Sequence, residues 1–196
     1  SVFALHENDV LELALDIAVS DKIPSTPSSV IATERRIATI PNSGGRTALN
    51  ESSDGQWLSI GLSRFEDGAG PRILIIHVET GEVRELCRLP KPPGYASHVQ
   101  WSLTNPYLLS FASPSEHGND FAGPRRPNDG PTDYINRRQR LWVVDIRNGI
   151  PHNVYHALEG EVVTHESWWV DDQMLFSGGT RNDPPIEQHV KLLDVH

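Results

Sequence analysis

A strand–turn–strand pattern that occurs three times limits the possible folds of this chain more than any other feature of the sequence. The three copies span residues 46–60, 97–111 and 163–177. In each copy a short strand leads into a polar turn, and a second strand then ends in small or aromatic residues. The turns contain Asp54-Gly55 and Asn105-Pro106, in which the first dipeptide tolerates positive φ and the second fixes φ. Repeats of this kind indicate an array of similar units.

A second strand pair follows each copy. Residues 73–86 read as an apolar strand, a Thr-Gly turn and a return strand, and residues 141–150 repeat this with an Asn-Gly turn, a strong hairpin signal. Residues 190–196 begin the pattern a third time, and the sequence stops before the turn. Four short strands per repeat, without helical spacing of apolar residues, predict an all-β fold: a β-propeller of four-stranded blades.

The equivalent positions Ala48, His98 and His165 set the blade lengths. They are separated by 50 and 67 residues, whereas a usual blade has about 40–50 residues. We therefore place an insertion at residues 112–139, between the second and third strands of its blade. The predicted division is a remnant of a preceding blade at 1–45, blades at 46–96 and 97–162, and a partial blade at 163–196.

The first 45 residues are less regular. Residues 10–19 are apolar enough for a strand, although residues 11–18 could also form a short helix, and residues 24–29 are a Pro/Ser-rich connector. The chain thus holds about three to four blades, whereas propellers have roughly 4–8. Missing blades or another chain would be needed to close the ring, because open sheets need partners.

Composition narrows the function classes. The formal net charge of −9 makes nucleic acid a poor default partner. The sequence contains no run of 18 apolar residues, so no membrane span is predicted. Residues 1–7 include no initiator Met and lack the regions of a signal peptide. Cys87 is the one cysteine, so no internal disulfide is possible, and we interpret it as a packed structural residue rather than a nucleophile. We expect a cytoplasmic protein.

Propeller geometry predicts where chemistry could occur. The first strand of each blade lines the central channel, and His98 and His165 begin that strand in neighbouring blades. Both should therefore face one rim of the channel. The insertion 112–139 should cover that rim, and Arg140, at the start of the following strand, should point there too.

The insertion concentrates positive charge in an acidic chain. Five arginines fall within sixteen residues: Arg125, Arg126, Arg137, Arg138 and Arg140. Arginine grips carboxylates through paired hydrogen bonds, so a small anionic ligand is the simplest functional interpretation. The alternative is a solvated loop whose arginines pair with its own acidic residues, which are Glu116, Asp120, Asp129 and Asp133.

The other candidates also have structural interpretations. His165 could be a channel histidine bonded to Glu166 or to the backbone, and His98 could be structural or could contact a substrate. His117 should be exposed, and His77 should be structural because it matches Asp145 in its strand. The tryptophans should mostly pack between blades, although one could stack on a sugar ring; they are Trp101, Trp142, Trp168 and Trp169.

Three segments resemble motifs of the oligogalacturonate lyases. Residues 163–169 (VTHESWW) resemble the family's His-Glu-Phe/Ser-Trp segment, and residues 97–106 (SHVQWSLTNP) its His-x-Gln-aromatic-Ser segment. Residues 139–145 (QRLWVVD) resemble the Arg-Ile/Leu-Trp strand after the insertion. The resemblance covers roughly residues 45–196. It implies a seven-bladed propeller that cleaves short oligogalacturonides, which are pectin fragments, to unsaturated uronates by β-elimination.

By resemblance, His165 falls on the catalytic base and Arg140 on the catalytic arginine. His98 and the four insertion arginines would contact the di- or trigalacturonate substrate. The family binds a divalent metal, typically Mn²⁺, through ligands beyond the third repeat, partly in a His-x-His motif. This sequence contains no His-x-His, so we assign no metal ligand, although the resemblance implies the metal.

Two other functions remain open on the sequence. The chain could be a non-catalytic TolB-like propeller that binds a partner or a small anionic ligand. It could also be a blade domain of a propeller-gated peptidase, although no Gly-x-Ser-x-Gly motif occurs.

Overall fold

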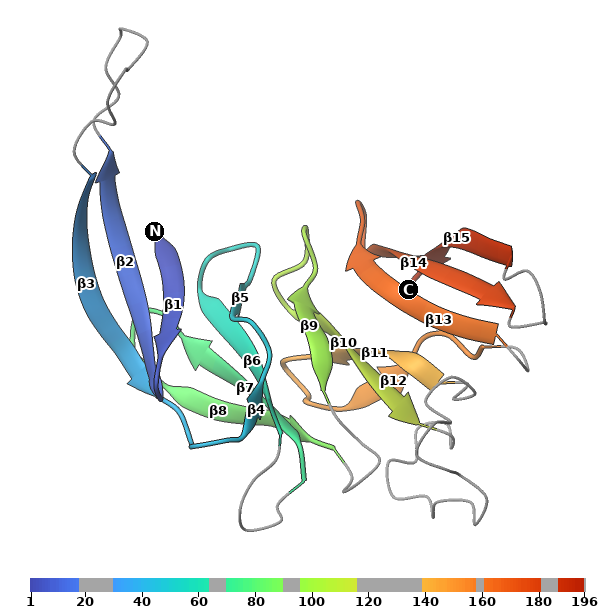
Figure 1. Cartoon of the computed structure of the whole chain (residues 1–196), viewed down its shortest axis with the longest axis horizontal. Coiled ribbons are helices and arrows are strands. Elements are labelled where there is room, and N and C mark those ends of the chain that lie inside the picture. Colours follow the sequence, from blue (N-terminus) through green and yellow to red (C-terminus); the bar gives the residue numbers. More distant parts are fainter. Residues whose placement is uncertain are drawn as a thin grey trace, which may run out of the picture.

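The structure is a computed structural model that describes residues 1–17, 30–63, 70–89, 96–115, 139–157, 161–180 and 187–195. Within these ranges the chain forms β-strands, arranged in four antiparallel sheets that follow one another along the sequence (Figure 1). The predicted all-β fold is confirmed, and the sheets form part of a propeller. No helix in the described ranges is long and apolar enough to cross a membrane.

The two outer sheets have three strands each. The first is ordered β1-β2-β3, with β1 at Val2–His6, β2 at Asp9–Ile17 and β3 at Val30–Thr39. The fourth is ordered β13-β14-β15, with β13 at Glu161–Trp168, β14 at Gln173–Thr180 and β15 at Glu187–Asp194.

The two middle sheets are larger. In the second, β6 (Trp57–Ser63), β7 (Arg72–His77) and β8 (Val83–Arg88) follow an edge strand that is split into β4 (Gly45–Arg46) and β5 (Asn50–Glu51). The third is ordered β9-β10-β11-β12, with bounds Ser97–Trp101, Leu108–Ser115, Gln139–Asp145 and Pro151–Asn153.

Two local expectations differ from the structure. A short helix at residues 11–18 is wrong, because β2 pairs with β1 on one side and with β3 on the other, which requires extended backbone. The ends of the predicted insertion 112–139 are also strand, since β10 continues to Ser115 and pairs there with Gln139 of β11. Residues 116–138 lie outside the described residues.

The repeats align at the turn that follows each sheet's first strand. The backbone N–H of Ser52 donates to the Trp57 carbonyl, that of Ser102 to Leu108, and that of Trp169 to Gln173, at 2.9, 2.9 and 2.7 Å. Counting back four residues from each donor gives Ala48, His98 and His165. The structural register of the three copies therefore matches the register read from the sequence.

Apolar cores lie between successive sheets, so the middle strands are buried on both faces. In β7, Ile73 and Ile75 pack toward the third sheet, whereas Leu74 and Ile76 pack toward the first. In β11, Trp142 and Val144 pack toward the second sheet, and Leu141 and Val143 toward the fourth. Each fully buried large apolar side chain contributes roughly 1.5–3 kcal/mol. This explains why the third strand of each middle sheet is a continuous apolar run.

Glycine at the outer turns allows the sheets to approach closely. Gly81 and Gly149 have φ of 72° and 69°, a region that glycine adopts without strain. A Cβ at Gly81 would lie 2.3 Å from the Ile37 carbonyl oxygen, and one at Gly149 would lie 2.8 Å from that of Leu86. The Thr-Gly and Asn-Gly dipeptides thus serve the packing between sheets as well as the turn itself.

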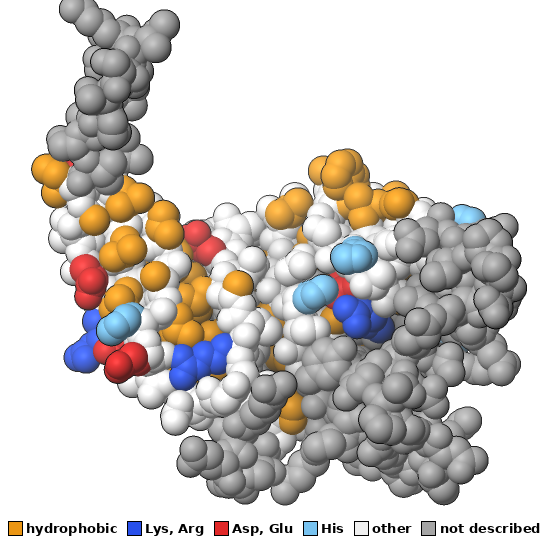
Figure 2. All heavy atoms as spheres, viewed as in Figure 1, with side chains coloured by type: hydrophobic (Ala, Val, Ile, Leu, Met, Phe, Trp, Pro, Cys, Tyr) orange, Lys and Arg blue, Asp and Glu red, His pale blue; other side chains and the backbone are white. Residues whose placement is uncertain are grey.

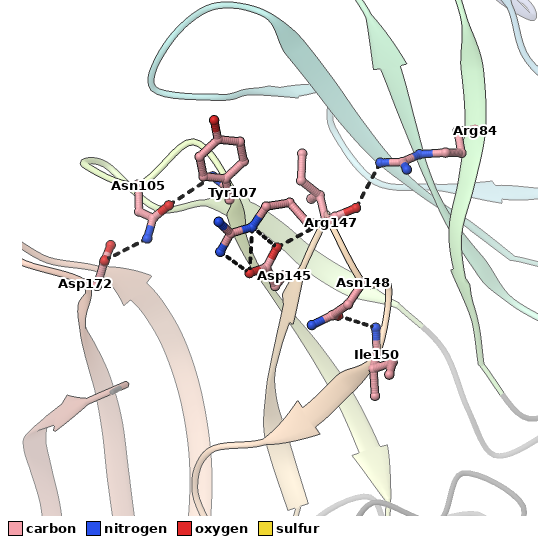
Figure 3. Close-up of polar contacts among 9 residues, drawn as sticks. Arg84, Asn105, Tyr107, Asp145, Arg147, Asn148, Ile150 and Asp172 are labelled. Carbon is pink, nitrogen blue, oxygen red and sulfur yellow. Dashed lines mark hydrogen bonds and ion pairs between the residues drawn. The ribbon is translucent and has the colours of Figure 1, made fainter.

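Polar contacts join the turns of neighbouring sheets (Figure 3). Asp172, in the β13–β14 turn, accepts hydrogen bonds from Ser102 Oγ at 2.5 Å, Thr104 Oγ1 at 3.2 Å and Asn105 Nδ2 at 3.1 Å. Arg84 of β8 donates to the Ile146 carbonyl at 2.9 Å. These bonds fix the third sheet against both of its neighbours.

The fourth sheet has one open face. Leu193 of β15 packs toward the third sheet, whereas Val190 and Leu192 are 78% and 55% exposed. Alternate residues of a strand point to opposite faces. No described residues form a sheet over the apolar face carried by Val190 and Leu192, which is the state expected of a partial propeller.

Candidate functional site

A hollow lies where the first strands of three sheets approach one another. Its volume is about 830 Å³, and its lining comprises residues 46–48, 50, 97–100 and 165–167, drawn from the β4–β5 region, β9 and β13. Figure 2 shows histidine and basic side chains next to one another on this face, where β9 and β13 meet. His98 and His165, which the sequence placed on one rim, both line the hollow.

Both histidines occupy an unusual backbone conformation. His98 has φ of 49° and His165 has φ of 53°, in the left-handed region that histidine enters more readily than most residues do. In each sheet the strand pairing shifts register at this point, which marks a β-bulge. Bulges re-aim a side chain and often occur beside functional sites. The same irregularity therefore recurs at the same position of two sheets.

Glu166 is the most buried charged group of the site. Its side chain is only 1% exposed, although it is an acidic residue on the first strand of the fourth sheet. A carboxylate at such a depth requires ionic or hydrogen-bonded partners. Its partners come from two other strands, β9 and β11.

His98 is the partner from β9. Its Nδ1 lies 2.9 Å from Oε1 of Glu166, and its side chain is 45% exposed. The ring thus has one nitrogen on a buried carboxylate while much of its surface remains accessible. A proton on Nδ1 is needed for this contact, because the ionised carboxylate can only accept.

Arg140 is the partner from β11. Its Nε and Nη2 donate to Oε2 and Oε1 of Glu166, each at 3.2 Å. This is the two-pronged geometry that suits a guanidinium and a carboxylate. Arg140 is 19% exposed and is not among the residues that line the hollow. It therefore stands behind Glu166, joined to the hollow through that carboxylate.

Strand β13 is held against β9 by two further bonds. Gln100 Nε2 donates to the Glu166 carbonyl at 3.2 Å, and Trp168 Nε1 donates to the Gln100 carbonyl at 3.1 Å. The pair His98 and Glu166 therefore lies on strands that are tied together on the same side of the hollow.

The structure brings together three of the predicted site residues. His98 and Arg140 meet on Glu166, and His165 lines the same hollow as His98. Within the described ranges no hydrogen bond is found for the His165 ring; the Glu166 carboxylate instead accepts hydrogen bonds from Arg140 and lies 2.9 Å from His98 Nδ1. The other candidates, Arg125, Arg126, Arg137 and Arg138, lie outside the described residues, as do His117 and residues 116–138.

The residues interpreted as structural have structural contacts. His77 accepts the Thr80 N–H through Nδ1 at 3.3 Å and packs edge-on against Trp57, at 4.8 Å between ring centroids. Cys87 is buried, and this burial raises the pKa of its thiol to about 12. The indoles of Trp101, Trp142 and Trp168 are buried, whereas Trp169 is half exposed.

Sequence reasoning missed Glu166 as a site residue. Strict alternation in a strand would send it to the face opposite His165 and leave it unremarkable. The bulge at His165 breaks that alternation, and only the fold brings β9 and β11 to the carboxylate. The available signal was an acidic residue directly after a rim histidine.

The charges of the site nearly cancel. Glu166 and Arg140 offset each other, and His98 adds a positive charge only when it is protonated. In the described part of the chain, no three His, Cys, Asp or Glu side chains lie close enough to hold a metal ion. The described residues thus offer imidazoles and one guanidinium, but they do not fit a Mn²⁺ centre.

Comparison with known proteins identifies the fold. No family model and no curated protein sequence matches the chain. Among solved structures, it is similar to an oligogalacturonate lyase in complex with manganese, at 17% identity and a TM-score of 0.59, over 83% of this chain and 42% of that one. It is also similar to an oligogalacturonate lyase from Vibrio parahaemolyticus, at 16% identity and a TM-score of 0.62, over 98% and 46%.

The likeness extends to propellers of other function. A putative TolB from Agrobacterium tumefaciens is similar at 14% identity and a TM-score of 0.50, over 84% of this chain and 51% of that one. At these identities the likeness shows the propeller fold alone. The chain spans less than half the length of the two lyases.

Proposed function

We propose that this chain is the part of a propeller that binds oligogalacturonides, the pectin fragments, and cleaves them by β-elimination. The observation that carries the proposal is Glu166, a buried carboxylate that holds His98 and Arg140 together beside a hollow lined by two histidines. The shared motifs around His98, Arg140 and His165 agree with it. The likeness of the fold to two oligogalacturonate lyases supports it as well.

The chemistry of a uronate explains these residue types. The C5 proton of a galacturonate lies next to the carboxylate and is weakly acidic. Its removal develops negative charge on that carboxylate, which a nearby cation stabilises. An imidazole is suited to accept the proton near neutral pH. The C4–O4 bond then breaks, C4 and C5 become doubly bonded, and the new end of the sugar is unsaturated.

The positions of the side chains support the following proposed roles. His165, which lines the hollow and has no hydrogen bond to its ring from the described residues, accepts the C5 proton. Arg140, which stands behind Glu166 and does not line the hollow, contributes its positive charge to the grip on the substrate carboxylate. The four arginines of the insertion would add to this grip. The described residues do not fit Mn²⁺, and the roles proposed here belong to side chains alone.

The groups proposed to act on the substrate all lie on this chain, and other blades complete the ring around them. The open face of the fourth sheet and the partial propeller require further blades or another chain to close the ring. We propose that the complete ring is a cytoplasmic lyase of di- or trigalacturonate.

An absorbance assay tests the proposal. The chain is incubated with digalacturonate, with and without Mn²⁺, and the ultraviolet band of an unsaturated uronate is followed. We expect a rise that is lost in His165→Ala and kept in His152→Ala, a matched control because His152 is exposed on β12. The proposal is overturned by a flat trace for the unaltered chain, or by a rise that His165→Ala leaves unchanged.

The second candidate is a non-catalytic TolB-like propeller that binds a partner or a small anionic ligand, a fold likeness that the chain also has. Binding of digalacturonate without any absorbance rise would support that candidate over the lyase.

A further inference from the structure

We infer that Glu166 is a positioning residue that makes His98 the proton donor to the departing sugar oxygen, so that two histidines share the elimination. This inference rests on the proposed function and deepens it, because that proposal uses a proton acceptor and a carboxylate clamp but names no donor.

Glu166 is deeply buried beside a more exposed His98. Its side chain is 1% exposed, whereas that of His98 is 45% exposed. A buried carboxylate that is also held by Arg140 through two bonds cannot swing away from its place. The contact at 2.9 Å between His98 Nδ1 and Glu166 Oε1 therefore fixes the ring of His98.

The contact with Glu166 also sets the orientation of the His98 imidazole. With Nδ1 on Glu166, the other nitrogen, Nε2, lies on the far side of the imidazole. His98 itself lines the hollow, so Nε2 is the nitrogen available to a ligand there. A histidine whose one nitrogen is held by a carboxylate has a defined tautomer and orientation, as in catalytic triads.

The two histidines differ in their charged partners. His98 Nδ1 lies 2.9 Å from the buried Glu166 carboxylate, so an imidazolium at this position is paired with a negative charge and carries on Nε2 the proton that it gives away. His165 has no carboxylate partner in the described part of the chain, so it is assigned the role of proton acceptor. The two histidines occupy equivalent bulges on adjacent strands and face the same hollow.

The protons and electron pairs of the elimination are then all accounted for. The C5 proton passes to the His165 ring, and the electron pair of the C5–H bond forms the C4–C5 double bond. The C4–O4 bond breaks with its electron pair on O4, and the Nε2 proton of His98 passes to O4. His165 leaves the step protonated and His98 leaves it neutral, so one proton exchange with water restores both. No oxidant, reductant or further reactant is needed.

Nitrogen NMR of the imidazole rings tests the positioning without any need for turnover. In the unaltered chain, neutral His98 should carry its proton on Nδ1, whereas an unconstrained histidine in water prefers Nε2. Glu166→Gln should return His98 to the ordinary preference, because one amide cannot accept from His98 and Arg140 as a carboxylate does. His152, which is exposed, serves as the internal control. An Nε2–H tautomer in the unaltered chain would overturn the inference.

The donor role is tested with two substrates. Digalacturonate has a poor leaving group that needs protonation, whereas a galacturonate with a nitrophenoxy group at C4 releases nitrophenolate, which does not. We expect His98→Gln and Glu166→Gln to lower turnover of digalacturonate by about 10²-fold or more, the usual scale of proton-transfer catalysis. Both variants should retain most turnover of the nitrophenyl substrate, whereas His165→Ala should lose both.

The outcomes separate this inference from the proposed function. Equal losses on the two substrates in His98→Gln would overturn the donor role and leave the lyase function standing. An unaltered chain that turns over neither substrate would contradict the proposed function, and the donor role would fall with it. A merely structural Glu166 would lower the melting temperature without any difference between substrates.

Discussion

Arg140 and Glu166 face each other across two sheets, with both carboxylate oxygens of Glu166 accepting hydrogen bonds from the Arg140 guanidinium at 3.2 Å. Arg140 lies on β11 of the third sheet and Glu166 on β13 of the fourth. This pair thus lies at the proposed site and also links the third sheet to the fourth.

Removing Arg140 should destabilise the fold. Arg140→Met leaves the buried carboxylate of Glu166 with His98 as its remaining side-chain partner, and losing one member of a buried pair costs roughly 3–5 kcal/mol. Urea unfolding measures the change in the free energy of unfolding. The double variant Arg140→Met, Glu166→Leu should recover most of the loss, because it leaves no buried charge. A double variant as unstable as the single one would show that the pair itself is not the cause.

Asp172 should be a second stability determinant, away from the hollow. Asp172→Ala removes the acceptor of Ser102, Thr104 and Asn105, and we expect a loss of about 2–3 kcal/mol. Asp171→Ala is the matched control, because Asp171 is exposed and has a similar positive φ, 54° against 57°. Backbone strain therefore cancels in the comparison. Equal losses in the two variants would assign the effect to the backbone and not to the hydrogen bonds.

Glycine at the outer turn should be required for sheet packing. Gly149→Ala places a Cβ 2.8 Å from the Leu86 carbonyl, whereas Gly55→Ala meets only the flexible Glu51 side chain, at 3.3 Å. Both glycines have positive φ, so each variant loses about 1–2 kcal/mol from strain. Gly149→Ala should lose about 1–3 kcal/mol more from overpacking. Thermal melting of the two variants measures the difference, and identical melting temperatures would contradict the close approach.

Cys87 should be unreactive in the folded chain. Burial raises the pKa of its thiol to about 12, from an ordinary value of 9.0. Between these values the unfolded thiol loses its proton while the folded one keeps it, so stability falls as pH rises above about 9. Cys87→Ala should lack this component of the decline in unfolding free energy. Rapid alkylation of the native chain at about pH 8.5 would contradict the burial of the thiol.

Much of the fold could be predicted because its signals are local. The turn dipeptides and the continuous apolar runs of residues 73–76 and 141–144 report strands that are buried on both faces. The register of Ala48, His98 and His165 could be read for the same reason. The first, outer sheet was harder to predict, since only pairing with two neighbours distinguishes the strand Asp9–Ile17 from a helix.

The site could be predicted only in part. His98, His165 and Arg140 carry motif signals, and blade geometry placed the two histidines on one rim. Glu166 could not be singled out, because its importance comes from contacts across three strands that are distant in sequence. The left-handed φ at both histidines likewise depends on bulges that no local pattern reports.

The central claim is that the hollow between β9 and β13 is a uronate site. It is tested most directly by following the imidazole NMR signals of the chain during titration with digalacturonate, and with the uncharged digalactose as comparison. The account predicts that the signals of His98 and His165 move with digalacturonate alone, while that of His152 stays in place. Equal movement with the uncharged sugar, or signals of His98 and His165 that do not respond to digalacturonate, would contradict it.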